Sequence, residues 1–123
     1  MNYIKFLNII KNAYLKKQTF IYTYANKFNY NLAKILKFYK YINKIKIIYF
    51  KNKYFLFLDL NNKYWNQILG IKFIINNNYF KFKHLNKLNN YYGLYLLTTS
   101  KGLLSLALAK KLKIGGKLIC YIW

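Results

Sequence analysis

Residues 93–123 read GLYLLTTSKGLLSLALAKKLKIGGKLICYIW and hold the clearest structural pattern in the chain. The apolar run Gly93–Leu97 predicts a buried strand. Thr98–Gly102 predicts a turn, because hydroxyl-bearing residues and glycine favour turn conformations. Leu103–Lys111 predicts a short helix, with Ser105 available near its start.

A glycine pair divides the rest of this segment. Gly115 and Gly116 predict a second turn, and Leu118–Trp123 predicts a final strand. The asparagine-rich stretch that begins at residue 86 is the best candidate for a boundary between two lobes. We therefore expect a C-terminal lobe at residues 86–123 that is mostly antiparallel β with one short helix.

The preceding residues, 1–85, predict an N-terminal α/β lobe. Their pattern consists of a helix over 3–15, a strand over 18–24, a helix over 27–39 capped by Asn26, a hairpin over 43–58, and two strands over 71–75 and 79–83 flanking asparagines 76–78. The apolar stripes of the two helices would pack on the short sheet. The expected fold class is therefore α+β, with two small lobes.

The charge balance of the chain is extreme. Its 22 basic residues are all lysines, and Asp59 is the single acid, so the formal net charge is +21. A compact domain with so little negative charge repels itself unless a polyanion neutralises it. Nucleic acid is the strongest such partner, because each neutralised phosphate releases condensed counterions. The charge leaves one alternative open, a free basic protein that binds RNA or an anionic membrane surface non-specifically.

The residue usage indicates an AT-rich genome. Lysine, asparagine, isoleucine, tyrosine, phenylalanine and leucine dominate, and proline is absent. Such bias is common in genes kept inside organelles, but composition alone does not separate a mitochondrion from a relict plastid or an AT-rich bacterium. We expect a protein of the mitochondrial matrix, with a relict plastid as the alternative. Lys5 and Lys11 interrupt any apolar signal sequence, and no segment predicts a membrane span. We therefore expect that the protein does not insert into a membrane and that it is synthesised inside the organelle.

Catalytic chemistry has little support in the sequence. General acid–base catalysis usually employs paired carboxylates or histidines, whereas this chain offers Asp59, His84 and Cys120 singly. One cysteine also excludes an internal disulfide and a cysteine metal cluster. We therefore expect that the protein is not an enzyme and that it binds no metal and no cofactor. Cys120 is interpreted as a buried strand residue and His84 as a surface or RNA-facing residue among lysines.

Three short segments could contact RNA, but each has a structural alternative. The hydroxyls of Thr98–Gly102 can donate and accept hydrogen bonds in the shallow minor groove of RNA, or they can simply cap an ordinary loop. Gly115–Lys117 permits close approach of RNA, or forms a plain hairpin turn. Tyr79–Lys83 alternates aromatic and basic residues that would either stack on bases or pack in the core.

Taken together, these patterns resemble the bacterial-type small-subunit ribosomal protein S-eight family. In the C-terminal part the similarity covers Gly93, Leu96-Leu97, Thr98–Gly102, Leu103-Leu104, Ala109-Lys110, Gly115-Gly116 and Cys120–Trp123. Near the N-terminus, Leu7–Ala13 and Lys27–Lys37 are similar to the family's first and second helices, and Tyr41-Ile42 to the exit of the second. Residues 43–90 match only in the order of their strands.

The resemblance implies a protein that binds the central domain of small-subunit rRNA early in assembly. In that family the Thr-Ser-Lys-Gly turn contacts a distorted rRNA helix. The rRNA-binding residues carried over to this chain are Thr98, Thr99, Ser100, Lys101, Gly102, Gly115, Gly116, Lys117, Lys11, Asn12 and Lys27. The implied partners are this rRNA and neighbouring small-subunit proteins, and a homo-oligomer is not expected.

Several positions depart from the family pattern. Lys117 stands where the family commonly has an acid, which directs this side chain toward phosphate instead of an internal network. The proline before the second helix and the glycine after it are replaced by Tyr24 and Lys40. The helix expected after Gly102 is apolar on nearly every face. We therefore expect a neighbouring protein or extension to cover Leu106 or Leu108.

Overall fold

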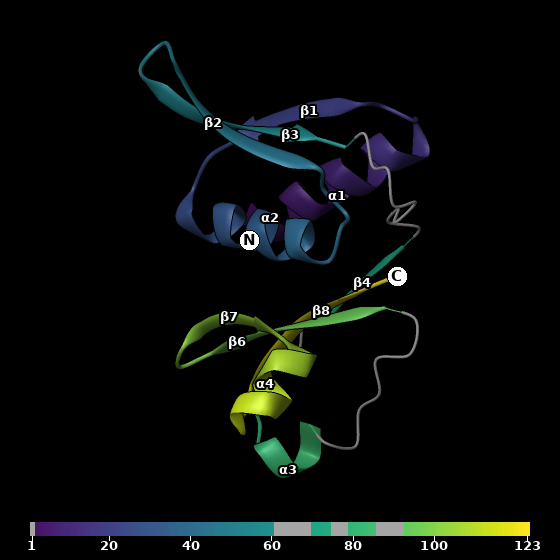
Figure 1. Cartoon of the computed structure of the whole chain (residues 1–123), viewed down its shortest axis with the longest axis vertical. Helices are drawn as coiled ribbons and strands as arrows, with labels where there is room; N and C mark the ends of the chain where they lie inside the picture. Colours follow the sequence, from purple (N-terminus) through teal and green to yellow (C-terminus); the bar gives the residue numbers. More distant parts are fainter. Residues whose placement is uncertain (1, 61–69, 75–78, 86–92) are drawn as a thin grey trace. The chain divides into compact units, whose positions relative to one another are not determined.

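The computed structural model describes residues 2–60, 70–74, 79–85 and 93–123 (Figure 1). The chain divides into two compact units, Met1–Leu69 and Gly70–Trp123. The division therefore falls before Gly70, whereas the sequence analysis placed it after residue 85. Strand pairing explains the difference, because the short strands between these two points pair with the C-terminal strand and so belong to the second unit.

The first unit contains two helices and a three-stranded sheet. Its elements are α1 (Asn2–Leu15), β1 (Phe20–Tyr24), α2 (Lys27–Phe38), β2 (Lys44–Phe50) and β3 (Lys53–Asp59). The strands pair antiparallel in the order β1-β3-β2, so β3 is central. The expected helices, strand and hairpin are confirmed, with ends that differ by no more than two residues.

Both helices lie against one face of this sheet (Figure 1). Leu7 and Ile10 of α1 and Leu32 and Leu36 of α2 are fully buried. Their three- and four-residue spacing places each pair on one side of its helix. The burial of alternate residues in β1 and β3 shows that one face of the sheet meets these helices.

The ends of α2 show how local sequence sets its limits. The Asn26 side-chain oxygen accepts a hydrogen bond from the Asn29 backbone N–H at 2.7 Å, so the expected cap is confirmed. Beyond Phe38, Lys40 adopts a φ of 68°. Glycine commonly takes this left-handed conformation after a helix, and Lys40 stands at the position where the family pattern has one.

The second unit is mostly antiparallel β. Its elements are β4 (Ile71–Phe73), β5 (Tyr79–Phe80), α3 (Phe82–Leu85), β6 (Leu94–Thr99), β7 (Gly102–Ser105), α4 (Leu106–Leu112) and β8 (Gly116–Ile122). The sheet order is β4-β8-β6-β7, and β5 also pairs with β8. The α+β class is thereby confirmed. The asparagine turn expected at residues 76–78 lies outside the described residues.

The strand expected over residues 79–83 is too long. Strand β5 ends at Phe80, and the residues from Phe82 onward form the four-residue helix α3. The alternation of aromatic and basic residues in this segment therefore does not continue along one extended strand. It gives way to a helical turn after only two residues that pair with β8.

The helix expected over residues 103–111 also begins later than predicted. Leu103 and Leu104 belong to β7, where they pair with residues of β6. Ser105 then caps α4, because its Oγ accepts a hydrogen bond from the Leu108 backbone N–H at 3.3 Å. The leucines that made this segment look apolar on every helical face are thus divided between a strand and a helix.

Leu106 is covered by the chain itself. It forms a buried cluster with Leu97, Ala109 and Leu118, and its exposed fraction is 0%. The expectation that a neighbouring protein or extension covers Leu106 or Leu108 therefore no longer concerns Leu106. Of the two leucines named in that expectation, Leu108 is the accessible one, with an exposed fraction of 42%.

Candidate nucleic-acid interface

The hydroxyl turn, residues 98–102, forms the tip of the β6-β7 hairpin. Thr98 and Thr99 end β6, Gly102 begins β7, and Ser100 and Lys101 connect them. Gly102 adopts a φ of +99°, a conformation that residues with side chains reach only with strain. The expected turn is therefore present, and glycine occupies the position where its geometry requires one.

The Thr99 hydroxyl shapes this turn from within. It donates a hydrogen bond to the Gly102 carbonyl oxygen at 2.9 Å and accepts one from the Lys101 backbone N–H at 3.1 Å. The first contact joins the ends of the two strands, and the second holds a residue of the connection between them. Thr99 thus fixes the conformation in which its neighbours are presented.

The outer part of the turn is accessible. Ser100, Lys101 and Gly102 are exposed, whereas Thr98 and Thr99 are half-buried. The exposed part presents a hydroxyl, an ammonium group and a stretch of backbone without a Cβ. A hydroxyl can donate to or accept from a 2′-hydroxyl, and an ammonium group can meet a phosphate.

The second glycine-containing segment lies beside the hydroxyl turn. Lys117 of β8 is the register partner of Thr98, and Gly115 and Gly116 precede it as buried residues. A Cβ on Gly116 would lie 2.7 Å from the Thr98 carbonyl oxygen and 2.8 Å from Thr99 Cγ2. The sheet therefore brings residues 98–102 and 115–117 together at one end of β6 and β8.

The remaining sequence-predicted residues belong to the first unit. Lys11 is half-buried and Asn12 is exposed on α1, and the Asn12 carbonyl accepts the Lys16 backbone N–H at 3.0 Å. Lys27 is exposed at the first position of α2. These side chains thus come from two helices of the first unit, whereas the hydroxyl turn belongs to the second unit.

In the part of the chain that the structure describes, the isolated titratable side chains do not form a cluster of reactive groups. Cys120 is buried in β8, and burial raises the pKa of its thiol to about 12. His84 is exposed in α3. Among the described residues, no three His, Cys, Asp or Glu side chains gather as a metal site would require. The helices described here also include none with the length and apolarity of a bilayer span.

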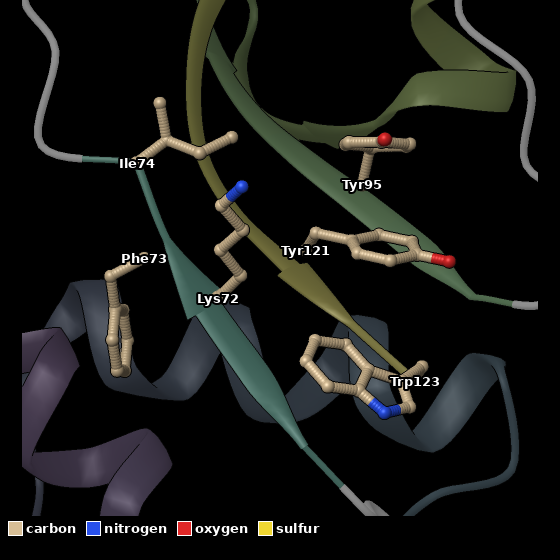
Figure 2. A pocket seen from close by; sticks show the side chains of 6 residues that line it. All are labelled: Lys72, Phe73, Ile74, Tyr95, Tyr121 and Trp123. Carbon is tan, nitrogen blue, oxygen red and sulfur yellow. The ribbon is translucent and has the colours of Figure 1, made fainter.

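The second unit also contains an aromatic hollow that was not predicted from the sequence. Tyr95, Tyr121 and Trp123 stand in a row beside Lys72 at a hollow of about 650 Å³ (Figure 2). The Tyr95 and Tyr121 rings are stacked with their centroids 4.4 Å apart. The Trp123 ring lies where a Cβ on Gly70 would overlap it. The two-residue spacing of Tyr121 and Trp123 was the available signal, since it places both on one face of β8.

Comparison with known proteins gives one consistent result. The family model described as ribosomal protein S8 matches residues 4–123. The small ribosomal subunit protein uS8 of Borrelia garinii subsp. bavariensis is 40% identical over 45 residues, which cover 37% of this chain and 34% of the relative. The protein uS8c of Trieres chinensis is 44% identical over 45 residues, with the same two shares, 37% and 34%. The protein uS8 of Thermosipho melanesiensis is 44% identical over 41 residues, which cover 33% of this chain and 31% of the relative. The matches therefore span about a third of each relative.

Proposed function

This chain belongs to the ribosomal protein S8 family, and from that premise we propose that it binds the central domain of small-subunit rRNA and helps the subunit to assemble. The observation that carries this proposal is the hydroxyl turn. Its backbone is held by the two hydrogen bonds of Thr99, and it presents Ser100 and Lys101 to the solvent. A turn that already has its bound shape loses little conformational freedom when RNA binds.

The charge of the chain supports the same function. A net charge of +21 with a single acid favours a polyanionic partner over any neutral one. The lysines are spread over both units, so they supply affinity at many phosphates. The hydroxyl turn would supply the contacts that depend on the shape of one rRNA helix.

The proposed setting is the translation system of an organelle, with the mitochondrial ribosome first and a relict plastid second. The AT-rich residue usage supports an organelle genome. The similarity to uS8c of Trieres chinensis, which carries a chloroplast-type name, is consistent with an organellar form. Protein partners would be neighbouring small-subunit proteins, and the exposed Leu108 is a candidate contact.

The alternative of a free basic protein on an anionic membrane has less support. Surface-bound amphipathic helices bury their apolar side chains in the lipid. Here the apolar stripes of α1 and α2, such as Leu7 and Leu32, are already buried against the sheet, and Leu15 and Phe38 are exposed only at the last residue of each helix. Co-sedimentation separates the two functions, because a ribosomal protein stays with purified small subunits through a moderate salt wash, whereas a membrane-surface protein pellets with lipid.

The test of rRNA binding uses substitutions in the turn. Thr99→Val keeps the branched shape but removes both hydrogen bonds, and we expect about a tenfold weaker affinity for a central-domain rRNA fragment if each bond contributes about 0.5–1.5 kcal/mol. Thr23→Val is the matched control, because it makes the same change in β1 of the first unit. Lys101→Gln should lower the slope of log affinity against log salt by roughly one unit or less.

Each result bears on a different part of the proposal. Equal affinities for Thr99→Val, Thr23→Val and the unchanged chain would refute a role for the turn. An unchanged salt slope in Lys101→Gln would show that this lysine does not contact phosphate. Affinity is measured by filter binding over a range of salt concentrations, with the unfolding midpoint of each variant recorded to exclude misfolding.

A further inference from the structure

The face of the β1-β3-β2 sheet opposite α1 and α2 carries a cluster of aromatic side chains. We call it the aromatic face, and it consists of Phe20, Tyr22, Tyr24, Phe55 and Phe57. In β1 these aromatic residues alternate with buried ones, as expected where one side of a strand meets helices. The three β1 rings are 51–64% exposed. A large accessible aromatic cluster of this kind marks an interaction surface.

The rings are arranged in rows across the strands. Tyr22 pairs in register with Phe57, and Tyr24 pairs with Phe55. The Tyr24 and Phe55 rings lie 5.2 Å apart at an interplanar angle of 29°, and the Phe20 and Phe57 rings lie 5.5 Å apart at 26°. These two pairs are stacked, whereas the Tyr22 ring meets Phe57 at 61° and Phe20 at 82°, edge to face. Stacked and edge-to-face contacts together join the rings into one aromatic surface.

Lysines border this surface. Lys46 continues the row of Tyr22 and Phe57 on β2, and Lys44 lies two residues before it on the same edge strand. At the start of the central strand, the Lys53 Nζ lies 5.5 Å from the centroid of the Tyr24 ring. The single acid of the chain, Asp59, accepts a hydrogen bond from the Asn43 side-chain amide at 3.3 Å. Asp59 lies on this same face, in register with Phe20 and Lys44, so three lysines and one acid surround the rings and the net charge there is positive.

We propose that the aromatic face binds a stretch of unpaired RNA, whose bases stack on the rings while the bordering lysines contact its phosphates. Every base has a planar face that can stack on an aromatic side chain, whatever its sequence. The central strand also carries a lysine two positions before the first of two alternating phenylalanines, the arrangement that RNA-recognition sheets use to stack bases. This surface extends the proposed function beyond the hydroxyl turn, to a different kind of RNA structure.

Charge complementarity favours RNA over a protein as the occupant. The cores of protein interfaces are depleted in lysine, whereas lysines 44, 46 and 53 lie in or beside the rows of rings. Phosphates would neutralise these lysines along the whole length of a strand, and each contact would release counterions. A protein occupant is the competing outcome that the experiment must detect.

The test compares two pairs of tyrosines with similar exposure on opposite faces of one sheet. Tyr22→Leu with Tyr24→Leu removes two rings of the aromatic face but keeps it apolar. Tyr49→Leu with Tyr54→Leu is the control, because these residues pair with each other on the opposite face of the β2-β3 hairpin. The exposed fractions are 58% and 64% for the test pair, and 59% and 60% for the control pair.

The probe is a fluorescein-labelled oligouridylate of about twelve nucleotides, close to the span of known single-strand sites, followed by fluorescence anisotropy with the full chain. We expect the test pair to weaken binding at least about 25-fold, since each lost ring costs about fivefold or more. The control pair should change it less than about twofold. Heparin, a polyanion without bases, should bind all three proteins equally, because the lysines are unchanged.

Three outcomes would overturn the proposal: equal weakening by both pairs, a matching loss of heparin binding, or unchanged oligouridylate binding. The third outcome, with loss of a neighbouring protein from reconstituted small subunits, would identify the surface as a protein interface. Thr99→Val separates this inference from the proposed function. It should leave oligouridylate binding unchanged while weakening the central-domain fragment, so either surface can fail without the other.

Discussion

Replacing Gly116 by alanine should separate β8 from β6 at the place where both strands support the hydroxyl turn. The added Cβ would lie 2.7 Å from the Thr98 carbonyl oxygen, 2.8 Å from Thr99 Cγ2 and 3.4 Å from the Thr98 carbonyl carbon. Real Cβ atoms essentially never lie within 3.0 Å of other heavy atoms. Two of these contacts involve backbone atoms, which cannot be relieved by rotating a side chain.

The size of the effect follows from this overlap. Forcing an extra carbon into a packed site costs about 1–3 kcal/mol, and each kcal/mol lowers the unfolding midpoint of a small domain by roughly 4–8 °C. We therefore expect Gly116→Ala to lower the midpoint by about 4 °C or more. Circular dichroism measures the midpoint, and amide hydrogen exchange should show faster exchange in β6 and β8 than in the first unit.

A second substitution tests which contact is responsible. Thr99→Ser removes the Cγ2 methyl group but keeps the hydroxyl that holds the turn. The double variant with Gly116→Ala should recover only part of the lost stability, because the Thr98 carbonyl oxygen stays in the way. Full recovery would contradict the backbone overlap, and an unchanged midpoint in Gly116→Ala alone would refute the close approach of the strands.

Three further predictions concern stability and reactivity. Lys40→Gly should raise the free energy of unfolding by about 0.5–1 kcal/mol, because Lys40 has a φ of 68°, which glycine adopts without strain. The control Lys37→Gly, within α2, should lower the free energy of unfolding by about 1 kcal/mol. Urea unfolding measures both, and the opposite order of stabilities would contradict this reasoning. Tyr14→Phe should raise it by roughly 1 kcal/mol in the same assay, because the buried Tyr14 hydroxyl has no hydrogen-bond partner among the described residues and burial raises its pKa. Burial also raises the pKa of Cys120 from 9.0 to about 12, so the folded state favours the neutral thiol. The free energy of unfolding should therefore fall as the pH rises from 9 toward 12, because the thiol loses its proton more easily in the unfolded chain. Iodoacetamide should label this thiol slowly at pH 8 in the folded chain and quickly in urea; equal rates would show that Cys120 is accessible.

The first unit could be predicted closely because its signals are local. The apolar spacing in α1 and α2, the Asn26 cap and the alternation of residues in the β2-β3 hairpin each depend on residues close together in the chain. The aromatic face was overlooked for the opposite reason. It becomes visible only when β1 is placed beside β3, which is a pairing between residues 20–24 and 55–59.

In the second unit, long-range pairing overrode local propensity. Leucine favours helix, and the run from Leu103 to Leu108 looks helical in isolation. Pairing with β6 draws its first three residues into a strand, and Ser105, the last of them, caps α4. The boundary between the units was misplaced for a related reason, since β4 and β5 join a strand that lies more than thirty residues later in the chain.

The structure also changes the role assigned to the three hydroxyls of the turn. In the sequence they are equivalent candidates for RNA contact. In the fold, Thr99 both donates and accepts a hydrogen bond inside the turn, so we expect it to influence the proposed RNA binding through the conformation of its neighbours. We expect the proposed direct contacts from Ser100, Lys101 and the Gly102 backbone, which are exposed. The capping and RNA-binding interpretations are therefore not exclusive, because the internal hydrogen bonds create the shape that the RNA would recognise.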